Sequence, residues 1–313
     1  MRIRLLVMLV LAVLLNACVS APQSAALWQQ IPPEFEVPVL LSQVPFFAQE
    51  LYQCGPAALA TILDASGVKV TPEQLVPLVY VPARKGSFQV EMVAAARSHG
   101  RLAYRITPTL EALLSEVAAG HPVLTLQNQG LSWYPLWHFA VVKGYDLQRR
   151  KLILNSGVYE NYEMSLAVFE RTWARSEHWA MLALVPGMMP EKPEPVSYFS
   201  ALVALEQNNT ADLVRPGYIS GLQLWPADRN LLMGYGNLLN AENSPDEAVI
   251  QFRKIIALDP LYAPAHNNLA TILFELGRQD EALAHARQAV RLGGDYLENY
   301  QDTLRKIESV TSN

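Results

Sequence analysis

Cysteine is scarce in this 313-residue chain, which contains only Cys18 and Cys54. Two cysteines exclude the disulfide-rich class of small secreted proteins, and no further ligands follow at the spacings of structural zinc sites. A glycine-rich phosphate loop is also lacking, and a formal charge of −5 gives no basic surface for nucleic acid. The sequence therefore predicts no metal ion, no cofactor and no nucleic-acid partner.

Long hydrophobic runs are absent except at the N-terminus, where two arginines precede an apolar run from Leu5 to Leu15. A basic start, an apolar core of about 7 to 15 residues and a small residue before the cut are typical of an export signal. The run is too short to span a bilayer stably. We therefore expect residues 1–17 to be a signal peptide and residues 18–40, which lack periodicity, to be a tether.

The end of this signal, LNAC, resembles a bacterial lipobox, in which the cysteine is acylated and becomes the first residue of the mature protein. Acylation of Cys18 would supply more than the two signals needed for stable anchoring. Val19 stands where an aspartate would retain such a protein at the inner membrane. We therefore expect a palmitate-bearing lipoprotein of the outer membrane that faces the periplasm, with ordinary secretion as the alternative.

Cys54 is then the one remaining thiol, and it stands in QELYQCGPAAL at the predicted start of a helix. An unpaired cysteine in an oxidising compartment is either buried or functional. Pro56 suits the first helical turn, where its missing N–H is not needed. Free backbone N–H groups and the helix dipole favour a thiolate there, so we expect a lowered pKa and a nucleophile. The alternative is that Cys54 is a small buried apolar residue that packs the helix against the domain.

A nucleophilic thiol needs a base, and His138 fits this role best. It begins the apolar strand HFAVVKGYD, and the next strand ends at Asn155, 17 residues later, so both lie near the same end of neighbouring strands. In a Cys-His-Asn arrangement the histidine takes the thiol proton and the amide orients the ring. The other histidines have simpler explanations at helix ends, in turns or in repeats: His99, His121, His178, His266 and His285.

Attack on a carbonyl creates an oxyanion, for which Gln49, five residues before Cys54, is a candidate donor. VPFFAQELYQCGPAALATIL, followed by HFAVVKGYD and LILNSG, resembles the papain-like cysteine peptidases of the bacteriocin-processing family, which cut leader peptides after a double glycine. The resemblance covers Val44–Val185 and implies Cys54 as nucleophile, His138 as base, Asn155 as orienting residue and Gln49 as oxyanion donor. The family often has aspartate where Asn155 stands, and its glutamine usually lies six residues before the cysteine.

Helical patterns over 54–65, 71–79 and 89–98 precede strand patterns around His138 and Asn155. This order predicts an α+β domain over residues 41–186, and the resemblance implies a papain-like fold in which helices pack on an antiparallel sheet. Prolines are dense over residues 187–196, which we expect to form a semi-rigid linker.

The C-terminal part of the chain repeats itself, because DEA recurs at 246–248 and 280–282, an offset of 34 residues. This period, with small residues at the helix crossings, is typical of tetratricopeptide repeats. The alternative is an unrelated helical bundle. We expect Pro216 to break a helix of the degenerate repeat. The predicted all-α domain covers 197–313, with clear repeats over 229–262 and 263–296, a degenerate repeat over 195–228 and a capping helix over 297–310.

Three functions remain open. The first is a cysteine peptidase that hydrolyses peptide bonds through a Cys54 thioester, with the repeats recruiting a peptide substrate or a partner protein. The second is a silent peptide-binding scaffold, and the third is an amidase or acyltransferase in which an amine intercepts the thioester. The aromatic stretch 133–137 lines a substrate groove in one interpretation and forms core or a lid in another.

Overall fold

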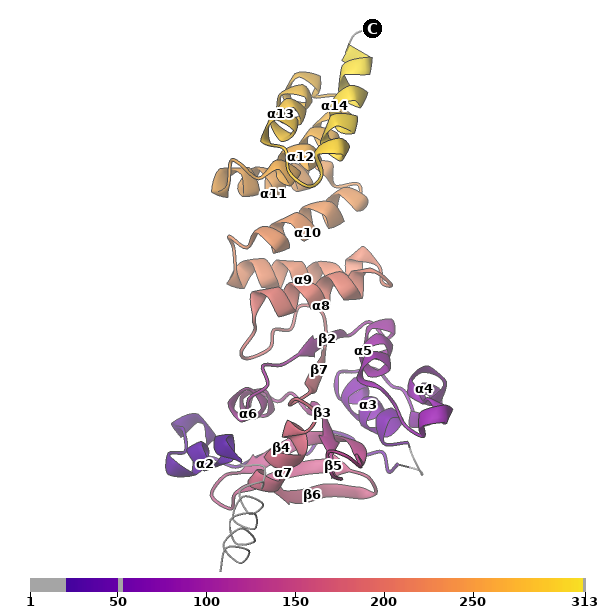
Figure 1. Cartoon of the computed structure of the whole chain (residues 1–313), viewed down its shortest axis with the longest axis vertical. Helices are drawn as coiled ribbons and strands as arrows, with labels where there is room; N and C mark the ends of the chain where they lie inside the picture. Colours follow the sequence, from indigo (N-terminus) through magenta and orange to yellow (C-terminus); the bar gives the residue numbers. More distant parts are fainter. Residues whose placement is uncertain (1–20, 50–52, 312–313) are drawn as a thin grey trace, which may run out of the picture. The chain divides into compact units, whose positions relative to one another are not determined.

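The computed structural model describes residues 21–49 and 53–311, so the predicted signal peptide and Cys18 lie outside the described residues. The chain divides into two compact units, each of which is described by itself (Figure 1). Of the described residues, the first unit contains those up to His99, 105–183 and 190–192, and the second contains 100–104, 184–189 and those from Pro193 onward. None of the helices in the described parts is long and apolar enough to cross a membrane.

The first unit is built on a sheet in which the strand order is β7-β3-β4-β5-β6 and β1 pairs with β4. The β3–β4, β3–β7, β4–β5 and β5–β6 pairs are antiparallel. The predicted α+β class is confirmed. The strands are β1 (Val39–Leu40), β2 (Leu102–Arg105), β3 (Val123–Asn128), β4 (Trp137–Asp146), β5 (Lys151–Ser156), β6 (Tyr159–Ser165) and β7 (Ala180–Leu184).

Two helices of this unit begin at recognisable caps. Thr71 and Gln74 form a capping box, and the Thr109 hydroxyl accepts from Ala112 N at 3.1 Å. Helix α3 is apolar on nearly every side, and its residues 55–63 are buried, so burial fixes the helix that starts at Cys54. The elements are α2 (Pro22–Gln29), α3 (Cys54–Ala65), α4 (Pro72–Val79), α5 (Gln89–Ser98), α6 (Leu110–Ala118), α7 (Leu166–Ala174) and the 3-10 turns Pro33–Phe35 and Pro82–Arg84.

The predicted tether is corrected over its described part, because Pro22–Gln29 form helix α2 and this helix is fastened to α7. The buried Glu170 carboxylate accepts from Gln23 N at 2.9 Å, from Ser24 N at 2.7 Å and from Ser24 Oγ at 2.6 Å. These bonds satisfy N–H groups that a helix start leaves without partners. Periodicity could not reveal this, since the cap lies about 146 residues away in sequence.

Part of the predicted linker is also fixed. The buried Glu116 carboxylate accepts from Glu191 N at 2.9 Å and contacts His121 Nδ1 at 2.8 Å, and Lys192 forms an ion pair with Glu111. Residues 190–192 therefore belong to the first unit instead of spanning open solvent.

The second unit consists of paired helices. Its crossings use small side chains: a Cβ on Gly236 would lie 2.9 Å from the Phe252 ring, and Ala248, Ala270 and Ala282 are fully buried. The predicted helical repeats are confirmed as the fold of this region. The helices are α8 (Pro195–Glu206), α9 (Ala211–Leu224), α10 (Arg229–Ala241), α11 (Pro245–Leu258), α12 (Ala263–Glu275), α13 (Gln279–Leu292) and α14 (Leu297–Thr311).

The predicted break at Pro216 is wrong, because α9 continues through that residue. A proline inside a helix removes one hydrogen bond and crowds the preceding turn. Packing compensates here: Tyr218 is fully buried one half-turn later, and its hydroxyl donates to Glu206 at 2.8 Å. Tertiary contacts therefore override the local preference.

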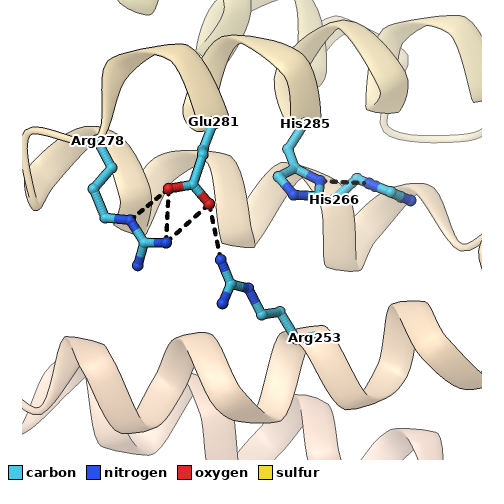
Figure 2. A network of polar contacts seen from close by, with 5 residues as sticks. All are labelled: Arg253, His266, Arg278, Glu281 and His285. Atoms are coloured by element: carbon cyan, nitrogen blue, oxygen red, sulfur yellow. Dashed lines mark hydrogen bonds and ion pairs between the residues drawn. The ribbon is translucent and has the colours of Figure 1, made fainter.

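A polar network joins three helices of the repeats (Figure 2). Glu281 of α13 accepts from Arg278, the residue directly before this helix, and from Arg253 of α11, each at 2.8 Å. One turn further along α13, His285 Nδ1 lies 2.9 Å from His266 Nδ1 of α12. The network therefore links helices that belong to successive repeats.

Candidate active site

A recess lies at the N-terminal end of α3 and contains about 220 Å³ including the solvent at its mouth. Its walls come from the chain before α3, from α3 itself and from the adjoining ends of β4 and β5. It brings together three of the four predicted catalytic residues, Cys54, Gln49 and Asn155. The remaining lining residues are Phe46, Phe47, Ala57, Ala58, Thr61, Phe139, Ser156 and Gly157.

Cys54 is the first residue of α3 and has no disulfide partner among the described residues. Burial raises the pKa of its thiol above the ordinary value, although the backbone N–H groups of Phe139, Gly55 and Cys54 lower it in part. The expected lowered pKa is therefore wrong, because desolvation of the thiolate outweighs the helix N-terminus. At neutral pH the sulfur is a protonated thiol that needs a base.

Gly55 allows the loop before α5 to approach the start of α3. A Cβ at this position would lie 2.2 Å from Ser87 Oγ and 3.4 Å from Met92 Sδ. No other residue has a side chain small enough for this contact. The glycine next to the cysteine therefore has a packing role that sets where the thiol lies.

His138 lies at the start of β4, one residue before the Phe139 amide that faces the sulfur. Its Nε2 is 2.9 Å from Ser156 Oγ at the end of β5. Burial lowers the pKa of the imidazole, so the ring stays neutral at pH 7. Within residues 21–49 and 53–311 we find no hydrogen bond between the imidazole and the Cys54 thiol, although Ser156 lines the recess that contains this thiol.

Asn155 does not lie behind the His138 ring. Its Nδ2 donates to Pro45 O at 2.9 Å, and its Oδ1 accepts from Asn161 N at 3.4 Å. The reason is the register of the β4–β5 pair, in which Val141 faces Asn155. Side chains alternate along a strand, so Asn155 shares a side of the sheet with Val141, whereas Ser156 shares the side of His138.

Asn155 instead fixes the wall of the recess formed by residues 44–49. The buried Lys143 Nζ donates to Val44 O at 3.2 Å, next to the carbonyl that Asn155 binds. Gln49 N donates to Gly157 O at 3.1 Å and fixes the other end of the segment 44–49. These three bonds hold Gln49 at the recess, where its amide faces the same space as the thiol.

Sequence reasoning missed Ser156 and Lys143. Ser156 directly follows a predicted residue, but the sequence alone could not favour it over Asn155, because the choice depends on the register shift between Val142 and Gly144. Lys143 did give a signal, a lone charge inside the apolar run HFAVVKGYD.

Metal chemistry finds no support in the donor set. Across the parts of the chain that the structure describes, no group of three or more His, Cys, Asp and Glu side chains is arranged to hold an ion. The polar side chains that line the recess carry a thiol, two amides and two hydroxyls.

Comparison with known proteins divides the chain in the same order. Residues 41–181 match the sequence model of the Peptidase_C39 like family, and residues 252–284 match that of a tetratricopeptide repeat. The chain thus carries a Peptidase_C39-like domain followed by C-terminal tetratricopeptide repeats. No curated protein matches the sequence.

Among solved structures, a C39-like peptidase from Bacillus anthracis is 19% identical, covers 46% of this chain and 96% of its own, and has a TM-score of 0.41. The Yersinia enterocolitica secretion chaperone SycD is 15% identical over 40% of this chain and 92% of its own, with a TM-score of 0.37. The first tetratricopeptide repeat domain of Spaghetti, bound to an HSP90 peptide, is 17% identical. It covers 38% of this chain and 94% of its own, with a TM-score of 0.36.

Proposed function

We propose that this chain is an envelope-anchored cysteine peptidase that hydrolyses peptide bonds through a Cys54 thioester. The observation that carries the proposal is the grouping at one recess of a helix-start thiol, a glutamine amide and the hydroxyl that binds a neutral imidazole. A scaffold needs none of these groups in this arrangement. The proposed catalytic part covers residues 41–186, as predicted from the sequence.

In the proposed reaction His138 is the general base. Its Nε2–H donates to Ser156 Oγ, which leaves the Nδ1 lone pair to take the thiol proton. The sulfur then attacks the scissile carbonyl, and the oxyanion is stabilised by Gln49 Nε2 and the backbone N–H of Cys54. Collapse expels the amine, which takes the proton from His138. Water activated by the same imidazole cleaves the thioester and restores the thiol.

The tetratricopeptide repeats supply protein recognition in this proposal. Arrays of this kind bind extended or helical peptides on their surfaces. Here they recruit either the substrate or a partner that presents it. Anchoring comes from acylation of Cys18, which would place the enzyme at the outer membrane facing the periplasm.

Product mass tests the reaction. The purified chain is incubated with an unstructured protein substrate in water enriched in oxygen-18, and the fragments are analysed by mass spectrometry. Hydrolysis predicts one heavy oxygen at each new C-terminus, and Cys54→Ala is expected to abolish cleavage. Amine adducts in place of the heavy oxygen would support acyl transfer, and unchanged cleavage by Cys54→Ala would refute both reactions.

A silent peptide-binding scaffold is the second candidate. Two observations favour it: the hydroxyl behind His138 carries no negative charge to stabilise an imidazolium, and burial raises the pKa of the Cys54 thiol. A scaffold predicts that the intact chain binds peptides but shows no cleavage and no thiol labelling that depends on His138.

A further inference from the structure

Exposed apolar side chains gather at the end of the sheet where the recess lies. They come from the β3–β4 loop, the start of β4 and the β5–β6 turn, and each is more than half exposed. We call this surface the aromatic platform: Trp133 (81%), Tyr134 (65%), Leu136 (57%), Trp137 (51%), Val158 (61%) and Tyr159 (64%). The exposure excludes the core-packing interpretation of the aromatic stretch, and a patch of this kind marks an interaction surface.

The loop that presents these rings is held in place by hydrogen bonds. Leu131 and Tyr134 exchange two backbone bonds of 3.1 Å, and Asn128 Oδ1 accepts from Gly130 N and Leu136 N at 2.9 and 3.0 Å. Arg175 Nη1 donates to the carbonyls of Asn128 and Gly130, both at 3.0 Å. A fixed loop presents its aromatic side chains without the entropy cost of ordering the loop backbone on binding.

The platform is continuous with the recess. Trp137 directly precedes His138, and Val158 directly follows Gly157, which lines the recess with the thiol. On the next strand, Tyr159 is the register partner of Ser156. A chain that lies across the platform therefore reaches Cys54 without leaving the surface.

The platform residues themselves carry no charge, and neither residues 130–142 nor residues 152–159 contain a Lys, Arg, Asp or Glu. The charged neighbours are already paired: Glu160 forms an ion pair with Lys143 at 3.8 Å, and Arg175 donates to the carbonyls of Asn128 and Gly130. Surfaces that bind anionic membranes combine apolar side chains with Lys or Arg, which this segment does not offer. An uncharged aromatic surface is complementary to an uncharged apolar polypeptide, because neither side must desolvate a charge on contact.

We propose that the aromatic platform binds the substrate as an extended, uncharged polypeptide segment whose bulky apolar side chains flank the bond presented to Cys54. This inference rests on the proposed peptidase function and assigns its substrate class. Trp133 and Trp137 are the principal anchors, since aromatic residues on fixed loops dominate binding energy at such surfaces. They select substrates and take no part in bond cleavage.

Binding is tested in the full-length chain carrying Cys54→Ser, so that the result does not depend on turnover. The probe is a fluorescein-labelled peptide in which glycine alternates with leucine and phenylalanine, and a second peptide has glutamates in place of the apolar residues. Fluorescence anisotropy gives each Kd. We expect the apolar peptide to bind more tightly, and Trp133→Ala with Trp137→Ala to raise its Kd by at least about tenfold.

The matched control is Trp28→Ala, which removes a partly exposed tryptophan from α2, outside the platform. Trp28→Ala should leave the Kd unchanged. Trp133→Phe with Trp137→Phe should restore most of the binding, and the double alanine and double phenylalanine variants are compared at equal thermal unfolding midpoints. The proposal would be overturned if the apolar peptide did not bind, or if the double alanine variant had an unchanged Kd. It would also be overturned if the double alanine variant lost only the binding of phosphatidylglycerol vesicles, measured in parallel. Binding without cleavage in the wild-type chain would refute the peptidase alone.

Discussion

His138 Nε2 lies 2.9 Å from the hydroxyl oxygen of Ser156, so a neutral side chain stands behind the imidazole. A carboxylate in that position would stabilise the charged ring and raise its pKa, which a hydroxyl does not do. Burial then lowers the pKa of His138 without an opposing charge. The site is therefore expected to react from a neutral thiol and a neutral imidazole. It should react more slowly than a site that holds a thiolate–imidazolium ion pair.

Replacement of Ser156 tests this arrangement. Ser156→Ala should slow the labelling of Cys54 by a peptide-based thiol probe by up to about tenfold, because one orienting hydrogen bond of about 1 kcal/mol is lost. Ser156→Asp should accelerate labelling, since a carboxylate favours the imidazolium. Mass spectrometry of the labelled peptide gives both rates. Equal rates in all three proteins would show that the hydroxyl does not act through His138.

Replacement of Asn155 should have a different effect. Asn155→Ala removes the donor to Pro45 O, so the segment 44–49, which carries Gln49, loses one of the hydrogen bonds that hold it. We expect slower reaction with the peptide probe but unchanged alkylation by iodoacetamide, which does not need the oxyanion donor. Hydrogen exchange at Gln49 N should also become faster, and Lys143→Met should reproduce both changes. Slower iodoacetamide alkylation in Asn155→Ala would indicate that this residue acts on the thiol itself.

Glu170 is expected to hold α2 in place. Glu170→Ala leaves the N–H groups of Gln23 and Ser24 and the Ser24 hydroxyl without their acceptor, at a cost on the order of 3 kcal/mol. Thermal unfolding should show a lower midpoint, and limited proteolysis should cut first within residues 22–29. Glu163→Ala, which removes an exposed partner of Arg149, serves as the control and should change little. A midpoint equal to that of the wild type would contradict the fastening of α2.

Acid should destabilise the repeats through the histidine pair of Figure 2. His266 Nε2–H donates to Pro260 O at 3.1 Å, so its Nδ1 accepts from His285 Nδ1–H. Burial lowers the pKa of His285, and electrostatic interactions with His266 and Arg253 lower it further, while Glu281 opposes them. The unfolded chain therefore binds a proton near pH 6.5 while the folded chain does not, so stability falls as pH drops below about 6.5.

The measurement for this pair is the thermal unfolding midpoint of the helical repeats between pH 8 and pH 5. We expect the wild type to lose more stability on acidification than His285→Gln. His99→Gln, which removes a histidine at the end of α5, is the control. An equal pH dependence in the wild type and His285→Gln would assign the acid effect to other groups.

The fold could be predicted further than the site. The apolar run after Cys54, the strand patterns around His138 and the 34-residue offset each report local periodicity, which the sequence displays directly. The partner of His138 depends on register, and the pairing shifts between Val142 and Gly144. A change of one position moves a side chain to the other side of a strand, so Ser156 and not Asn155 contacts the ring.

Other differences arise from contacts between distant segments. The pKa of Cys54 depends on burial by the recess walls, and helix α2 depends on Glu170. The continuous helix through Pro216 depends on the packing of Tyr218. None of these contacts leaves a periodic signal in the residues that it affects, so a single sequence could not predict them.

The central claim is that His138 activates the Cys54 thiol, and it is tested most directly by the pH dependence of Cys54 labelling with the peptide-based probe. Wild type is expected to react near neutrality, with an acid limb below about pH 6.5 because burial lowers the pKa of His138. His138→Ala should react only as pH rises through the raised pKa of the thiol. Identical profiles for the two proteins would contradict the claim and leave Cys54 a buried thiol without a base.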